Sequence, residues 1–245
     1  MRMLIDEKGK KIFVQKNAKQ DEIHSHLGMM SRKDVFKAKS GSYIKSHKNH
    51  KFLVVDPTIV DYFENLRRGP AIVLLKDAGI ISAHTGISPG SFVVEAGSGS
   101  GALTCYLANL VRPLGHIVSY EREKKFMEIA KENVETFELG EYVTFKNKDA
   151  KTISEKEVDA VILDLAEPWH IVKKAEKALK TGGFFVSYLP TVNQLMVLND
   201  ALAKTKLKIT KVVDVNMQEW KLGDATRPQS MQLAHTAFIL FARKL

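Results

Sequence analysis

The chain has 245 residues and carries 37 Lys and Arg against 28 Asp and Glu, a net charge of +9. Hydrophobic residues make up 44% and charged residues 27%, values that are typical of globular proteins and that exclude a wholly disordered chain or a coiled coil. No apolar run approaches the roughly 18 to 20 residues that cross a membrane, and the single Cys105 excludes an intrachain disulfide and a multi-cysteine metal site. We therefore expect a cytosolic protein without a metal or a membrane anchor, built as one large domain or as a core domain with a small appendage.

The positive charge is concentrated in the first part of the chain. Residues 1–70 hold 15 Lys and Arg against 8 Asp and Glu, a net charge of +7, whereas the rest of the chain has a net charge of only +2. Lys45, Lys48 and Lys51 form the densest group. A polyanion is the natural partner, because each neutralised phosphate releases condensed counterions. A solvated face that binds nothing is the alternative.

Residues 1–56 contain short apolar runs and no long helical pattern, which predicts a small basic β-rich module. Its expected strands are residues 3–5, 11–15 and 52–55. Pro57 suits the first turn of a helix, and apolar residues then recur on one face until Arg67. We assign residues 57–90 to a helical connector.

Residues 91–245 alternate β-branched runs with helical patterns, which predicts a parallel sheet covered on both faces. Two longer β-like segments at the end of the chain look like an antiparallel pair at the sheet edge. A doubly wound, mostly parallel seven-stranded sheet with an antiparallel C-terminal hairpin is the arrangement usual in S-adenosylmethionine-dependent methyltransferases. The expected strands are 92–95, 116–121, 142–146, 158–164, 184–189, 206–221 and 232–244, and the expected helices are 102–111, 123–137, 168–179 and 192–204.

A glycine-rich turn gives the strongest local signal. The run Val-Val-Glu-Ala-Gly-Ser-Gly-Ser-Gly ends at Gly101 and leads from a strand into a helix, where glycines let the backbone and a helix N-terminus approach a ligand closely. The third glycine comes one residue earlier than in dinucleotide-binding folds, and Glu95 would repel a pyrophosphate but attract the amino and sulfonium end of S-adenosylmethionine. The predicted cofactor contacts in this turn are Glu95, Gly97, Ser98, Gly99, Ser100, Gly101, Ala102 and Leu103.

Acidic residues close the next strands of the predicted sheet. Glu121 could accept hydrogen bonds from both ribose hydroxyls of an adenosine, and Asp149 could bind the adenine amino group. Asp164 follows four apolar residues, and burying a charged group at such a position costs free energy, which indicates a function for it. The carboxyl ends of parallel strands are where such sheets bind ligands, so we expect these three at one pocket, with Asn193 on another wall. Solvated loop acids or helix caps are the alternative.

Several motifs together resemble the tRNA adenine-58 N1-methyltransferase family, the TrmI-like enzymes of archaea and bacteria. They are Glu-Ala-Gly-Ser-Gly-Ser-Gly at 95–101, Ser-Tyr-Glu at 119–121, Leu-Asp-Leu-x-Glu-Pro-Trp at 163–169, Tyr-Leu-Pro-x-x-Asn-Gln at 188–194, Arg227-Pro228 and His235-Thr236-Ala237-Phe238. The likeness extends upstream through Leu27-Gly28, Arg67-Arg68 and Lys76-Asp77-Ala78. One departure is Leu74-Leu75, where the family usually carries Tyr-Pro or His-Pro.

The resemblance implies an activity and a set of roles. The activity is transfer of a methyl group from S-adenosylmethionine to N1 of adenine 58 in tRNA, with or without a neighbouring adenine, by a homo-oligomer that is commonly a tetramer. Glu121 and Asp149 would hold the cofactor's ribose and adenine, and Asp164 would contact the cofactor and act as the catalytic residue facing the target base. The tRNA-contact candidates are Lys45, Lys48, Lys51, Asn193, Arg227 and His235.

Two other classes of function remain open from the sequence. A methyltransferase that acts on a small molecule or a protein would share the glycine turn and the acidic residues, but it would have little use for the basic N-terminal module. A non-catalytic RNA-binding subunit would normally have lost the glycine and Asp164 motifs, which are intact here.

Overall fold

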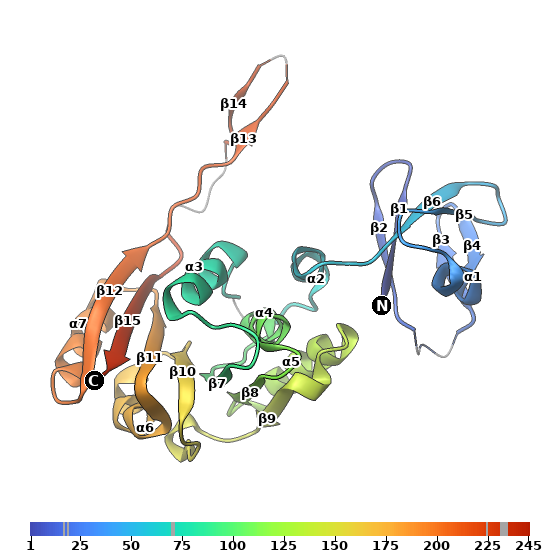
Figure 1. Cartoon of the computed structure of the whole chain (residues 1–245). Helices are drawn as coiled ribbons and strands as arrows, with labels where there is room; N and C mark the ends of the chain where they lie inside the picture. Colours follow the sequence, from blue (N-terminus) through green and yellow to red (C-terminus); the bar gives the residue numbers. More distant parts are fainter. Residues whose placement is uncertain (17, 19, 70–71, 224, 231–234) are drawn as a thin grey trace. The chain divides into compact units, whose positions relative to one another are not determined.

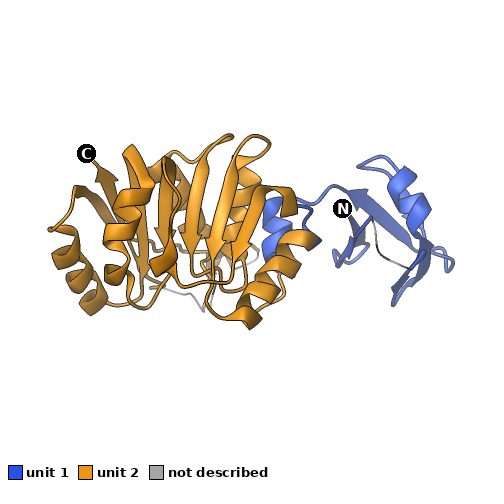
Figure 2. Cartoon of the chain, turned by 90° about the horizontal axis from the view of Figure 1, so that it is seen from below, with its two compact units in different colours: residues 1–65, 136–138 blue, residues 66–135, 139–245 orange. Residues whose placement is uncertain are grey.

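The computed structural model describes residues 1–16, 18, 20–69, 72–223, 225–230 and 235–245. The chain forms two compact units (Figure 2): unit 1 comprises residues 1–65 and 136–138, and unit 2 comprises residues 66–135 and 139–245. None of the helices in these described ranges is long and apolar enough to cross a membrane.

Unit 1 is built on a four-stranded antiparallel sheet in the order β2-β1-β6-β5. Its strands are β1 (Arg2–Asp6), β2 (Lys11–Val14), β5 (Tyr43–Lys45) and β6 (Lys51–Val55). Unit 1 also contains a separate antiparallel pair, β3 (Glu22–Ser25) and β4 (Gly28–Ser31), and the helices α1 (Arg32–Lys37) and α2 (Ile59–Asn65). The pair β3–β4 and α1 were not expected from the sequence, because elements of four to six residues show too little periodicity. Burial of Ile23, Met30 and Val35 in the same core as Leu4 and Phe52 holds them in place.

Unit 2 contains a seven-stranded sheet in the order β12-β15-β11-β10-β7-β8-β9. The strands are β7 (Phe92–Ala96), β8 (His116–Tyr120), β9 (Val143–Lys146), β10 (Val158–Leu163), β11 (Leu179–Leu189), β12 (Leu207–Asp214) and β15 (Phe238–Lys244). The five strands from β11 to β9 pair in parallel, whereas β15 runs antiparallel to both β11 and β12. The predicted doubly wound, mostly parallel sheet with an antiparallel edge is therefore confirmed.

Helices cover both faces of this sheet (Figure 1): α3, α4 and α5 lie on one face, and α6 and α7 lie on the other. Their bounds are α3 (Leu75–Thr85), α4 (Ala102–Val111), α5 (Lys124–Thr136), α6 (Val172–Ala178) and α7 (Val192–Leu202), with 3-10 turns at η1 (Gly140–Tyr142), η2 (Ala150–Thr152) and η3 (Pro168–His170). The core between the layers is hydrophobic, with Val94, Val161 and Phe185 fully buried. This packing fixes the strand ends that carry the acidic residues.

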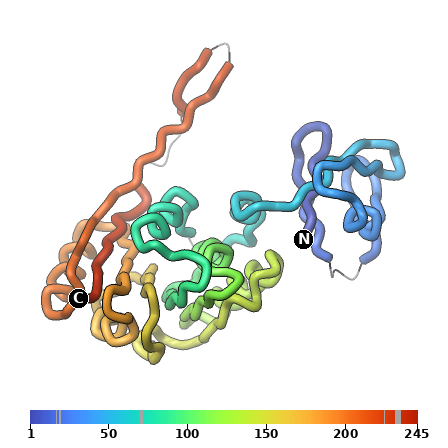
Figure 3. The backbone as a smooth tube through the Cα atoms, in the orientation of Figure 1, coloured from blue at the N-terminus to red at the C-terminus, as the bar shows by residue number. Residues whose placement is uncertain are grey.

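The last part of the chain differs in detail from the expectation. The predicted helix 168–179 divides into η3 and α6, and β11 begins at Leu179, five residues early, because Leu179 pairs with Val158 of β10. Between β12 and β15 the chain leaves the sheet and returns (Figure 3), with β13 (Trp220–Lys221) and β14 (Arg227–Pro228) forming a short pair of their own. Residues 232–234 of the expected last strand lie outside the described residues.

Candidate functional site

The glycine turn between β7 and α4 approaches two other segments closely. Gly97, Gly99 and Gly101 all have positive φ angles, of 92°, 54° and 79°, which side chains rarely allow. A Cβ atom on Gly97 would lie 2.0 Å from the backbone oxygen of Asp164, and one on Gly101 would lie 2.9 Å from Cα of Ala130. Glycine is therefore required for the turn to lie against the loop after β10 and against α5.

Glu95 lies buried beneath this turn, with 1% of its surface exposed. Its Oε2 accepts hydrogen bonds from Oγ1 of Thr104 at 2.5 Å and from Oγ of Ser119 at 2.6 Å, and the Ser119 hydroxyl lies 2.5 Å from that of Ser98. Its Oε1 is buried and has no hydrogen-bond partner among the described residues. Burial raises the pKa of Glu95 to about 7, against the opposing effect of the two hydroxyl donors. Glu95 thus lies beneath the glycine turn with one carboxylate oxygen hydrogen-bonded and the other, Oε1, buried and unpaired among the described residues.

Glu121 follows β8 and is held by two backbone donors. Its Oε2 accepts a hydrogen bond from the N–H of Gly99 at 3.1 Å, and its Oε1 accepts one from the N–H of Glu123 at 3.0 Å. The amide of Asn147 donates to the carbonyl oxygen of Glu121 at 2.8 Å and fixes the backbone. A carboxylate oxygen can accept two hydrogen bonds, so each oxygen keeps one position for a hydroxyl. This arrangement suits the two adjacent hydroxyls of a ribose.

Asp149 lies after β9, where its Oδ1 accepts a hydrogen bond from the N–H of Lys151 at 2.7 Å and caps η2. The residue is exposed, and its Oδ2 makes no hydrogen bond with a described residue. Phe126 and Ile171 add apolar surface to the same pocket. An acceptor next to apolar side chains suits an adenine ring with its amino group.

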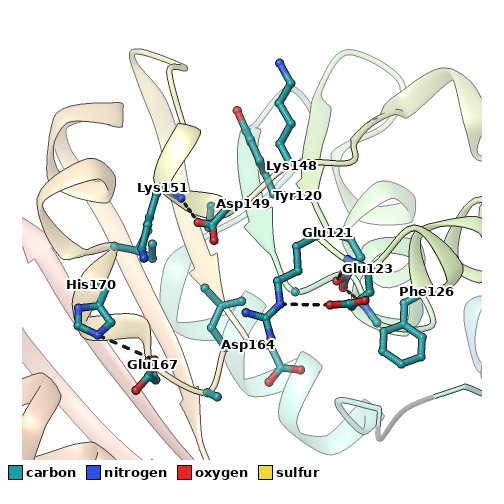
Figure 4. A pocket seen from close by; sticks show the side chains of 17 residues that line it. Tyr120, Glu121, Glu123, Phe126, Lys148, Asp149, Lys151, Asp164, Glu167 and His170 are labelled. Carbon is teal, nitrogen blue, oxygen red and sulfur yellow. Dashed lines mark hydrogen bonds and ion pairs between the residues drawn. The ribbon is translucent and has the colours of Figure 1, made fainter.

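Asp164 follows β10, and its backbone N–H donates to the carbonyl of Ala96 at 2.9 Å. Its carboxylate is half-buried and forms no hydrogen bond with a described residue. Burial, together with the negative charge of Glu121, raises the pKa of Asp164 to about 7. Figure 4 shows the side chains of Glu121, Asp149 and Asp164 around one cavity. The structure therefore brings the three strand-end acids together.

Some of the predicted cofactor contacts line this cavity and others do not. Gly97, Gly99, Glu121, Asp149 and Asp164 line it. The remaining predicted contacts are buried beside it or behind it and do not line it: Glu95, Ser98, Ser100, Gly101, Ala102 and Leu103. Other lining residues were not predicted, because the sequence does not show which side chains of a loop, a helix or a strand end face a cavity. They are Tyr120, Arg122, Glu123, Phe126, Lys148, Ala150, Lys151, Leu165, Ala166, Glu167, His170 and Ile171.

A buried polar network lies at the carboxyl end of β11. Asp77 of α3 is fully buried, and its Oδ2 accepts hydrogen bonds from the hydroxyls of Tyr188 at 2.9 Å and Thr236 at 2.8 Å. Lys76 donates to Asp77 Oδ1 at 2.8 Å and to the carbonyl of Val215 at 2.7 Å. Burial raises the pKa of Tyr188 and the charges of Asp77 and Asp164 add to that effect, so Tyr188 lies within electrostatic range of the cavity. The network joins α3, β11 and both ends of the excursion between β12 and β15.

Comparison with known proteins identifies the family. A family model described as the tRNA methyltransferase complex GCD14 subunit matches residues 52–227. This chain belongs to the GCD14 family. The predicted family is thereby confirmed.

Relatives of the GCD14 chain align over nearly its whole length. The tRNA (adenine(57)-N(1)/adenine(58)-N(1))-methyltransferase TrmI of Methanocaldococcus jannaschii is 32% identical, over 99% of this chain and 94% of that protein. The crystal structure of tRNA (m1A58) methyltransferase TrmI from Aquifex aeolicus superposes with a TM-score of 0.76 at 27% identity, over 100% of this chain and 96% of that one. The crystal structure of a protein named as a SAM-dependent O-methyltransferase, from Thermotoga maritima, gives a TM-score of 0.82 at 30% identity, over 100% and 92%.

The tRNA-contact candidates of this GCD14 member lie outside the cavity. Lys45, Lys48 and Lys51 are exposed on unit 1, Asn193 is exposed in the first turn of α7, and Arg227 is exposed on β14. When protonated, His235 donates from both ring nitrogens: from Nε2 to the carbonyl oxygen of Pro190 at 3.1 Å and from Nδ1 to Oδ2 of Asp214 at 3.1 Å. These contacts raise its pKa. Next to Asn193, Gln194 donates from Nε2 to the carbonyl oxygen of Ala166 at 3.0 Å, which ties α7 to the loop after Asp164.

Proposed function

We propose that this protein methylates N1 of adenine 58 in tRNA, using S-adenosylmethionine as the methyl donor. The observation that carries the proposal is the half-buried carboxylate of Asp164, which has no hydrogen-bond partner among the described residues and shares one cavity with Glu121 and Asp149. The names of relatives such as TrmI of Methanocaldococcus jannaschii support adenine N1 of tRNA as the target.

The residues of the cavity fit the cofactor. When bound, S-adenosylmethionine supplies an electrophilic methyl group on a positively charged sulfur. Glu121 keeps one acceptor position on each oxygen for the ribose hydroxyls, and Asp149 keeps Oδ2 for the adenine amino group. Glu95, whose Oε1 is unpaired, adds negative charge beneath the glycine turn, where the cationic end of the cofactor would be held.

Asp164 has the properties of the catalytic residue. Methylation at N1 places positive charge on the purine and makes its exocyclic amine more acidic. The Asp164 carboxylate would accept a hydrogen bond from that amine and stabilise the developing cation, and with a pKa of about 7 it could also take the proton. One such preorganised contact contributes about 10²- to 10³-fold to the rate.

The tRNA would bind to the basic surface of unit 1, which is formed by Lys45, Lys48 and Lys51. N1 lies on the base-pairing edge, so the adenine must be extruded into the cavity at a cost of a few kcal/mol. Lys45, Lys48 and Lys51 would hold phosphates of the same tRNA, with Asn193, Arg227 and His235 of unit 2 as further contacts. We propose a homo-oligomer, with a tetramer as the expected state, in the cytoplasm.

A second candidate is a methyltransferase for a small molecule or a protein, which the O-methyltransferase name of the Thermotoga maritima relative favours. The net charge of +7 in residues 1–70 favours the nucleic acid instead.

Nucleoside analysis of an unmodified tRNA transcript after incubation with the protein and S-adenosylmethionine tests the proposal. We expect one 1-methyladenosine per tRNA, which should disappear when adenine 58 is replaced by guanosine; a parallel replacement of adenine 57 reports on the neighbouring position. Absence of 1-methyladenosine, or its persistence in the transcript without adenines 57 and 58, would overturn the proposal.

A further inference from the structure

The solvent-side face of the unit 1 sheet carries a row of apolar and aromatic side chains. Alternate residues of a strand point to opposite faces, and Leu4 and Phe52 point into the core of unit 1. Ile5 pairs with Leu53, and Leu53 pairs with Tyr43, so these three lie side by side on the other face. Ile5 and Leu53 are half-buried, and Tyr43 is 66% exposed. An aromatic ring thus stands at the end of a short apolar row.

This row lines a hollow with a cationic rim. Ile5, Leu53, Tyr43 and Lys51 all contribute to the hollow, and Lys45 lies directly opposite Lys51 in the register of β5 and β6. In the described part of the chain, the side chains of Tyr43, Lys45 and Lys51 form no hydrogen bond or ion pair. Lys11, on β2 of the same sheet, differs, since it pairs with Asp61 and with Glu64 of α2.

One exposed acidic side chain, that of Glu7, borders the hollow and limits what the hollow can accept. Asp6 also borders the hollow, but its carboxylate is fully buried, because Asp6 pairs with Phe52 on the core-facing side of β1 and accepts hydrogen bonds from the backbone N–H groups of Lys8 and Lys10 at 2.8 and 2.9 Å. A phosphate would be repelled by Glu7 but attracted to the lysines at the rim. A nucleobase is uncharged, and its amino groups can donate to a carboxylate.

We propose that Tyr43, Leu53 and Ile5 form a stacking platform for one unpaired nucleotide of the bound RNA, with Lys45 and Lys51 contacting the phosphates on either side. Every base has a face that stacks on an aromatic ring, and unpaired bases are the ones whose faces are accessible. The bases of a continuous duplex are already stacked, so duplex RNA would meet only the lysines. Naming tRNA as the RNA rests on the proposed function, whereas the platform itself does not.

The test uses the full chain and a short single-stranded RNA that contains 2-aminopurine, whose fluorescence falls on stacking. Wild type should quench the probe. Tyr43→Ala should abolish the quench and weaken binding of the probe about 5- to 100-fold, the usual loss when one stacking side chain is truncated. Tyr43→Phe keeps the ring and should behave as wild type. Tyr43→Leu keeps apolar bulk without a ring and should resemble Tyr43→Ala.

Two controls make the test specific. The side chain of Tyr43 points away from the core, so all three variants should melt as wild type does. Binding of an RNA duplex of equal length should be unchanged by Tyr43→Ala. Equal affinity of wild type and Tyr43→Ala for the single strand, or an equal loss for the duplex, would overturn the platform.

Failure of the platform and failure of the proposed function give different results. If wild type forms 1-methyladenosine but Tyr43→Ala binds the single strand and tRNA as tightly as wild type, the platform is wrong and the proposed function stands. If wild type quenches the probe in a Tyr43-dependent way but forms no 1-methyladenosine, the proposed function is wrong and the platform stands.

Discussion

The charge state of Asp164 depends on burial, since no cation pairs with its carboxylate among the described residues. If it acts as proposed, its contribution is made mainly in the transition state. Asp164→Asn keeps the size and one acceptor but loses the charge. Single-turnover methylation at saturating S-adenosylmethionine should slow at least about 10²-fold, with tRNA affinity changed far less. A rate near that of wild type would show that Asp164 has a structural role only.

The raised pKa values of Glu95 and Asp164 predict that binding of the cofactor releases protons. The pKa of each is raised to about 7, so each carries a proton part of the time at pH 7. A cationic ligand favours the ionised form and lowers both pKa values. Binding of S-adenosylmethionine should therefore release protons at pH 7 and cease to do so well above that pH.

Calorimetry in two buffers with different ionisation enthalpies measures this release. Glu95→Gln and Asp164→Asn should each reduce the number of protons released. Binding enthalpies that are identical in the two buffers at pH 7 would contradict the assignment of these acids to the cationic end of the cofactor.

Glu121 is predicted to bind the ribose. Removing its carboxylate removes charge-assisted hydrogen bonds, so Glu121→Ala should weaken S-adenosylmethionine binding by about 1.5 to 3 kcal/mol. Because Glu121 also accepts from the N–H of Gly99, Glu121→Gln is the better-matched variant, and it should show a smaller loss. Titration calorimetry of the folded variants decides the point, and an unchanged affinity would remove Glu121 from the cofactor site.

At the scale of elements, the buried pair of Lys76 and Asp77 holds α3 against the end of β11 and the excursion. Lys76→Met leaves the Asp77 carboxylate buried without its cation, which should lower the free energy of unfolding by about 3 to 5 kcal/mol. The exposed Lys124 is the control, and Lys124→Met should cost under about 1 kcal/mol. Denaturant unfolding compares the two, and similar small losses would mean that the network is not a structural joint.

The elements of unit 2 could be predicted because each has a clear pattern. Val93, Val94 and the following glycines mark a strand, a turn and a helix start within a single window of sequence, and Asp164 follows an apolar strand in the same way. The network could not be predicted, since Lys76 and Thr236 are 160 positions apart and meet only through the fold. Their motifs supported the resemblance to the family, but the spacing in the sequence contains no information about this contact.

The short elements of unit 1 could not be predicted from the sequence for a different reason. The strands β3 and β4 have four residues each, and the buried hydrophobic side chains that hold them in place are those of Ile23 and Met30. The stacking platform also depends on register, because Tyr43 and Leu53 become neighbours only when β5 pairs with β6. Sequence pattern indicates strands, whereas pairing partners require the folded sheet.

At the scale of the whole molecule, the basic surface of unit 1 should control the salt dependence of tRNA binding. Replacing Lys45, Lys48 and Lys51 together with Ala should lower the slope of log affinity against log salt by up to about 2 to 3, since each phosphate contact contributes about 0.7 to 0.9. Affinity for S-adenosylmethionine should stay the same, because the proposed cofactor cavity is lined by residues of unit 2.

The matched control changes three exposed lysines of α6, namely Lys173, Lys174 and Lys177. This variant loses the same formal charge but should keep most of the slope. Equal slopes for the two triple variants would indicate that overall charge, and not the unit 1 surface, attracts the tRNA.

The strand order of unit 2 affects how the chain can fold while it is being synthesised on a ribosome. β15 lies between β12 and β11 and pairs with both, yet it is synthesised after both of them. Until β15 emerges from the exit tunnel, β12 has no neighbour in the sheet and one edge of β11 is open, and unpaired edges of this kind are prone to aggregation. The strands β7 to β10, which carry the acidic cavity, are translated earlier and pair with one another. A nascent chain stalled before residue 238 would therefore expose the unpaired strand β12 and one open edge of β11, beside strands that can already pair. Such an intermediate is a natural client for chaperones that bind nascent chains.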